Sequence, residues 1–142
     1  MSYCTLSDLD ARYGTALLVD LTDRAEEATG VIDAVAVAQA IADADAMIDG
    51  YVAGRYALPF ATVPDPIPAL SRAIAIYTLH VYQPNEKIEA DYRDAIDTLK
   101  GIARGSIKLN AAGVAPKTSG GHGARVTDRD RDFTAKTMKG FI

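Results

Sequence analysis

Residues 32–60 constrain the fold of this chain more than any other stretch. Their sequence, IDAVAVAQAIADADAMIDGYVAGRYALPF, is rich in alanine and ends in an aromatic turn closed by a proline. Apolar residues recur at three- and four-residue steps, which is the period of an amphipathic helix; they include Val37, Ile41, Ala44, Ile48 and Val52. We therefore expect a central helix over residues 32–52, with Asp33 as its N-cap and the other segments packed around it.

Four further segments carry helical signals. Thr5 can cap a short first helix that Gly14 would stop, and a second short apolar piece covers residues 16–21. Two longer amphipathic stretches cover residues 69–82 and 85–104. A chain of 142 residues fits one core. The sequence thus predicts an all-α fold, a small helical bundle of three main helices plus short N-terminal helices, with an extended C-terminal tail.

The stretch over residues 69–82 illustrates how the packed faces are predicted. One apolar face follows the helical period; its members are Leu70, Ile74, Tyr77 and Val81. His80 lies beside this face without a second histidine or a cysteine nearby. We therefore expect His80 to be a partly buried structural residue rather than a metal ligand.

The charge of the chain is unevenly distributed. Residues 1–109 carry 9 Lys/Arg and 16 Asp/Glu, whereas residues 110–142 carry 6 and 3. We expect 1–109 to form the helical domain and 110–142 to be a flexible linker and a partner-docking tail, because residues 110–124 are rich in Gly, Ala, Ser and Thr. The acidic body argues against ordinary duplex DNA binding, which needs clustered basic residues. The basic tail either meets an acidic partner surface or stays solvated.

The chemistry-bearing residues of the chain do not gather into a recognisable site. Cys4 is the only cysteine, so we expect no disulfide and read it as a small residue near the first helix, at a mobile terminus. His122 lies in the glycine-rich linker, and Asp128, Asp130 and Asp132 alternate with arginines that would oppose a cation. We expect no catalytic residues, no metal and no cofactor, and therefore no enzyme.

Four residues at the end of the central helix form an aromatic and cationic cluster, namely Tyr51, Arg55, Tyr56 and Phe60. One interpretation is a core cluster that ends the helix, with the Arg55 stem over a ring. The other is a subunit contact, since Tyr and Arg are enriched at interface hot spots. The two interpretations are compatible, and we carry the four as candidate interface residues.

Several segments of the body resemble one known family. They are YCTLSDLDARYG at residues 3–14, LTDR at 21–24, AIADADAMIDGYV at 40–52, RYALP at 55–59, and residues 92–109 ending in GSIKL. This order resembles the Mu-like phage and prophage family, formerly of unknown function, which is similar to the head–tail connector (adaptor) proteins of tailed phages. The resemblance covers most of residues 1–109 and is weak in the tail, where the glycine-rich linker departs from it.

The resemblance implies an all-α adaptor domain at residues 1–109 and a structural role in the virion. Such proteins form a ring, commonly a dodecamer, beneath the portal protein, and a stopper or tail-completion protein attaches below. The expected location is the neck of the virion, after assembly in the host cytoplasm. DNA would pass through the ring without sequence-specific binding, and no membrane is involved.

Within this expectation we assign two further groups of residues. Asp43, Asp45 and Asp49 of the central helix are candidates for an acidic channel lining. The candidate portal-docking residues lie in the tail; they are Arg125, Arg129, Arg131, Phe133 and Phe141. The alternative function is a small regulatory module that binds DNA or a host protein through its basic C-terminal tail.

Overall fold

The computed structural model describes residues 2–24 and 26–110, and this part of the chain is entirely helical apart from its connections. In chain order the helices are α1 (Leu6–Tyr13), α2 (Thr15–Thr22), α3 (Ala34–Val52), α4 (Ile67–Leu79) and α5 (Glu86–Arg104). No strand occurs among the described residues. The predicted all-α fold is confirmed, whereas the predicted tail from residue 111 onward lies outside the described residues.

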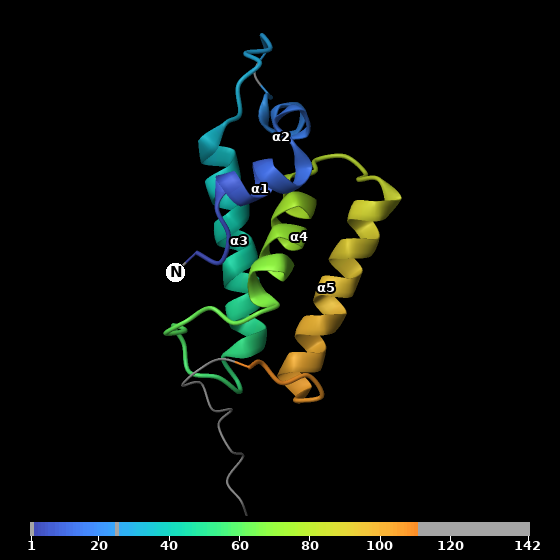
Figure 1. Ribbon diagram of the computed structural model, residues 1–142. Helices are drawn as coiled ribbons and strands as arrows, with labels where there is room; N and C mark the ends of the chain where they lie inside the picture. The colour runs from blue at the N-terminus through green and yellow to red at the C-terminus, as the bar shows by residue number, and fades with distance from the viewer. Residues whose placement is uncertain (1, 25, 111–142) are drawn as a thin grey trace, which may run out of the picture.

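The three long helices form the body of the molecule. Figure 1 shows α4 between α3 and α5, with α1 and α2 gathered at the end where α3 begins. The core between these helices is apolar: Ile48, Ile74, Leu99 and Ile102 are each 0% exposed. Burial of each such side chain stabilises the fold by roughly 1.5–3 kcal/mol, so the inter-helix core holds the bundle together.

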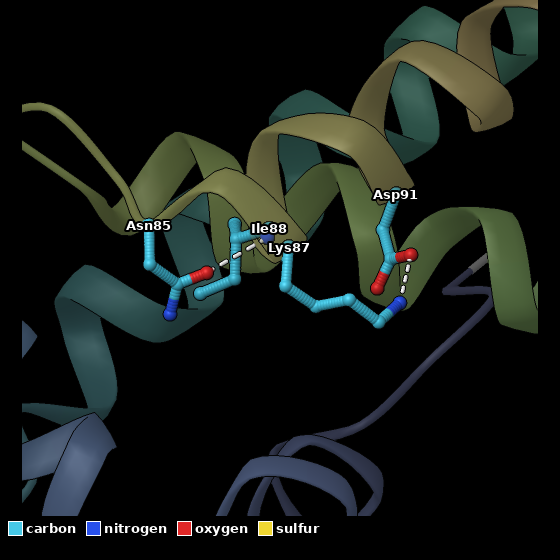
Figure 2. A network of polar contacts seen from close by, with 4 residues as sticks. All are labelled: Asn85, Lys87, Ile88 and Asp91. Atoms are coloured by element: carbon cyan, nitrogen blue, oxygen red, sulfur yellow. Dashed lines mark hydrogen bonds and ion pairs between the residues drawn. The ribbon is translucent and has the colours of Figure 1, made fainter.

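Polar caps fix where most of the helices begin. Thr5 and Asp8 form a reciprocal capping box at α1, and the Asp33 carboxylate accepts hydrogen bonds from the first turn of α3. At α5, Asn85 Oδ1 accepts a hydrogen bond of 2.9 Å from the Ile88 amide, and an ion pair between Lys87 and Asp91 follows one turn later (Figure 2). The bonds made by Thr5, Asp33 and Asn85 satisfy backbone N–H groups that lack partners within the helix.

The end of α4 differs from the prediction. The helix stops at Leu79, and His80 is extended with φ −73° and ψ 121°. Arg24 Nη2 donates a hydrogen bond of 2.8 Å to the Leu79 carbonyl, and the His80 ring Nδ1 lies 2.8 Å from the Ile76 carbonyl. These side chains engage carbonyls that a further helical turn would otherwise use. Val81 was therefore wrongly placed on the packed helix face: it lies beyond the helix and is 62% exposed.

Candidate interaction surfaces

The predicted aromatic cluster at the end of α3 lies mainly inside the subunit. Tyr56 and Phe60 are each 1% exposed, and their ring centroids are 6.5 Å apart. Tyr3 joins them, with its centroid 6.0 Å from that of Phe60. Tyr51 is half-buried. Tyr56 and Phe60 are therefore core residues of the single subunit. The role of the cluster as a subunit interface stays a prediction.

Two members of this cluster hold the segment that follows α5. The Leu109 amide donates a buried hydrogen bond of 3.0 Å to the Tyr56 hydroxyl, and Arg55 Nη1 donates one of 3.3 Å to the Arg104 carbonyl. The Arg55 guanidinium covers Gly105, where a Cβ atom would lie 2.4 Å from Arg55 Cζ. A cation is favourable at this point because the last carbonyls of a helix carry partial negative charge. The chain is thus tied to the end of α3 immediately before residue 110.

A second set of bonds ties the N-terminal segment to the middle of α3. The Tyr3 amide lies 3.3 Å from both carboxylate oxygens of Asp45, and Ser71 Oγ of α4 donates a hydrogen bond of 3.0 Å to the same carboxylate. The Tyr3 hydroxyl donates to Asp49 one turn further along. Asp45 is 9% exposed, so these donors compensate a carboxylate whose burial would otherwise be costly.

Cys4 belongs to this anchor rather than to a loose terminus. It is 3% exposed, and its Sγ lies 3.2 Å from Ser71 Oγ. Burial raises the pKa of the Cys4 thiol, which keeps it in the unreactive protonated form at neutral pH. Burial and the hydrogen bond to Asp49 likewise raise the pKa of the Tyr3 phenol. The expectation of a mobile terminus at Cys4 is wrong, because the polar anchor orders the chain from Ser2 onward.

An open groove runs along α3 beside this anchored segment. It has a volume of about 690 Å³. Four exposed alanines spaced one turn apart line its length, and the other lining residues include Leu6 and buried Val37 and Ile41; the alanines are Ala34, Ala38, Ala42 and Ala46. Asp45 and Asp49 lie at the end nearest the C-terminus of α3 and are the charged residues that line it. We call this feature the α3 groove.

The three aspartates proposed as a channel lining do not share one face. Asp45 and Asp49 both face the N-terminal segment, where Tyr3 binds them. Asp43 is exposed on another side of α3 and accepts a hydrogen bond of 3.0 Å from Gln39. Because Asp45 is buried, Asp43 and Asp49 are the two that reach solvent. Their role in a channel stays a prediction.

The other predictions about sites concern His80, metal binding, membrane spans and the tail. His80 is partly buried and bonded to a main-chain carbonyl, which confirms its structural reading. Between residues 2 and 110, no group of three His, Cys, Asp or Glu side chains is arranged to hold a metal ion. No helix among the described residues is long and apolar enough to cross a membrane. The predicted docking residues at positions 125–141 lie outside the part of the chain that the structure describes.

Comparisons with known proteins give a consistent result. Residues 3–128 match the family described as Bacteriophage Mu, Gp36. The chain is 34% identical to Gene product J of Escherichia phage Mu over 142 residues, which is 100% of both chains. It is 32% identical over 111 residues to the Mu-like prophage FluMu protein gp36 of Haemophilus influenzae, covering 78% of this chain and 79% of that one.

Proposed function

This chain belongs to the Bacteriophage Mu Gp36 family, and on that premise we propose that it is a structural head–tail connector of a tailed phage. As an adaptor it forms a ring under the portal and joins the capsid to the tail around the DNA channel. Its partners are further copies of itself, commonly as a dodecamer, the portal protein above and a stopper or tail-completion protein below. It assembles in the host cytoplasm and functions in the virion neck.

The observation that carries the proposal is a group of exposed apolar side chains near the start of α3 and the end of α4. Figure 1 shows these two helix ends on the same side of the bundle. Val31 and Val35 are 66% and 78% exposed, and Val81 and Tyr82 are 62% and 87% exposed. Arg24 lines one hollow with Val31 and another with Val81 and Tyr82. We call these four residues the apolar end. Clustered exposed apolar side chains are typical of protein–protein contact sites, and we assign the apolar end to contacts within the assembly.

The charge of the body fits a passage for DNA. Residues 1–109 carry 16 Asp/Glu against 9 Lys/Arg. An acidic surface repels phosphates, so DNA would slide past it instead of forming a tight complex. Asp43 and Asp49 are the members of the predicted acidic lining that reach solvent, and we assign them to the channel in this proposal.

The aromatic cluster and the tail are also assigned to contacts within the assembly. Tyr51 and Arg55 are half-buried and reach the surface, so they are the two members of the aromatic cluster that a neighbouring subunit would touch. Tyr56 and Phe60 would support that contact from inside the subunit. The tail arginines and phenylalanines are assigned to the portal in the assembled neck.

Electron microscopy of the purified chain, alone and mixed with its portal protein, tests this function. A ring, or attachment of the chain to the portal ring, is the expected result. The alternative is a regulatory module that binds DNA through the basic tail. It predicts that the chain does not bind the portal protein and binds DNA in a salt-sensitive way.

A further inference from the structure

We propose that, in the unassembled subunit, residues 125–142 bind in the α3 groove of their own chain. The inference concerns the free protein and does not depend on the connector role. Three observations support it: the apolar lining of the groove, the charge at one end of it, and the position of residue 110, where the described chain ends.

The α3 groove offers an apolar surface with room for large side chains. The four exposed alanines along α3 present only methyl groups, and buried Val37 and Ile41 lie beneath them. A volume of about 690 Å³ falls within the range of about 300–1,000 Å³ that is typical of sites binding small molecules. Residues 125–142 carry large apolar residues that could enter it, namely Val126, Phe133, Met138, Phe141 and Ile142.

The charges of the groove and of the segment are complementary. The charged residues lining the groove are Asp45 and Asp49. Asp45 is occupied by Tyr3 and Ser71, whereas Asp49 is half-buried and receives the Tyr3 hydroxyl on one of its two oxygens. Residues 125–142 hold five Lys/Arg and three Asp/Glu. A guanidinium of this segment can therefore pair with the second oxygen of Asp49.

A relay of contacts links the end of the described chain to the acidic end of the groove. Leu109 is bonded to Tyr56, the Tyr56 ring neighbours Phe60, and Phe60 neighbours Tyr3. Tyr3 in turn bonds to Asp49. These contacts form a continuous path from the described segment after α5 to the groove.

Residues 110–124 are long enough to bring residues 125–142 to the α3 groove of the same chain. Residues 110–124 are fifteen residues, and a flexible chain of that length spans about 21 Å on average. The α3 segment from residue 34 to 49 rises about 22 Å. The composition of residues 110–124 predicts a flexible linker. Such a linker gives an effective concentration in the millimolar range, which favours the groove of the same chain over that of a second copy.

Paramagnetic relaxation in the full-length protein tests the proposal. A nitroxide is attached to Thr137→Cys; buried Cys4 stays unlabelled, and mass spectrometry verifies a single label. The expected result is a loss of methyl signal intensity at Ala34, Ala38 and Ala42 that reduction of the nitroxide restores. Unchanged intensity at these alanines would overturn the proposal.

A mixing experiment identifies which chain supplies the segment. Spin-labelled chains without isotopes are mixed with isotope-labelled chains without nitroxide. Binding within one chain predicts no loss of alanine signal in the mixture. A loss as large as in the singly labelled sample would show that a second copy fills the groove, which overturns the own-chain assignment.

Two matched variants locate the effect. Ala42→Tyr places a ring in the groove and is expected to restore the Ala34 and Ala38 signals. Ala90→Tyr makes the same change at an exposed alanine of α5 outside the groove and is expected to leave the signal loss intact. Equal behaviour of the two variants would contradict binding in the groove.

Discussion

The Tyr3 hydroxyl donates a hydrogen bond to the Asp49 carboxylate across 46 residues of sequence. The same tyrosine offers its amide to Asp45 and its ring to Phe60. One N-terminal residue therefore connects the middle of α3 to the aromatic cluster at its end. The N-terminal segment is a structural part of the body, and its residues Ser2, Cys4 and Thr5 line the α3 groove.

Removing the Tyr3 hydroxyl is expected to destabilise the fold. Tyr3→Phe keeps the ring contact with Phe60 but deletes the bond to Asp49, which we expect to lower the free energy of unfolding by about 1 kcal/mol, a typical net value for one hydrogen bond. Urea denaturation followed by circular dichroism measures the change. Tyr82→Phe is the matched control, because Tyr82 is 87% exposed. An equal effect of both variants would contradict the anchor.

Stability is expected to fall at alkaline pH. Burial raises the pKa of Cys4 above its ordinary value of 9.0, and burial with Asp49 raises that of Tyr3 above 10.0. The unfolded chain therefore releases these protons at lower pH than the folded chain, so stability is lost as pH rises above about 9. Urea midpoints between neutral and alkaline pH measure this loss. Cys4→Ala should flatten the first part of the decline, and an unchanged slope in that variant would refute the assignment to Cys4.

A side chain at Gly105 is expected to destabilise the fold. Its φ is +83°, and a Cβ would lie 2.4 Å from Arg55 Cζ. A left-handed conformation costs a residue with a Cβ about 1–2 kcal/mol, and Arg55 would have to move as well. The guanidinium is the far end of a flexible side chain and can move at little cost, so Gly105→Ala should lower the free energy of unfolding by about that amount in urea titrations. Gly54→Ala, where a Cβ meets nothing within 4 Å, is the control, and a similar loss there would contradict this reading.

The isolated chain is expected not to bind duplex DNA with measurable affinity near physiological salt. Its acidic body lacks the clustered cations that release counterions from DNA. A mobility-shift titration of the full-length protein at low and moderate salt checks this expectation. A tight, salt-sensitive shift that disappears in Arg129→Glu with Arg131→Glu would support the regulatory-module alternative instead.

The periodic segments of the sequence predicted the fold well, because helical spacing and capping residues are local signals. The core helix with Asp33 as its cap, the Thr5 cap and the Gly14 stop all have direct counterparts in the structure. The end of α4 was predicted three residues too late. The hydrogen bond that replaces its last turn comes from Arg24, 55 residues earlier in the chain, and no local pattern carries that information.

The anchor was missed for the same reason. Asp45 and Ser71 both fall on the apolar stripes of their helices, between residues that are fully buried. A polar residue at a core-facing position indicates a buried hydrogen-bond partner, but the local pattern does not say which residue that partner is. The third partner, the Tyr3 amide, is a backbone group with no sequence signature.

The central claim, a ring-forming connector, is tested most directly by electron microscopy of the full-length chain with and without portal protein. The account predicts rings or portal-bound rings. It also predicts that Tyr82→Glu, which places a charge on the apolar end, abolishes them while Ala90→Glu on exposed α5 does not. A chain that stays monomeric and never attaches to the portal would contradict the account.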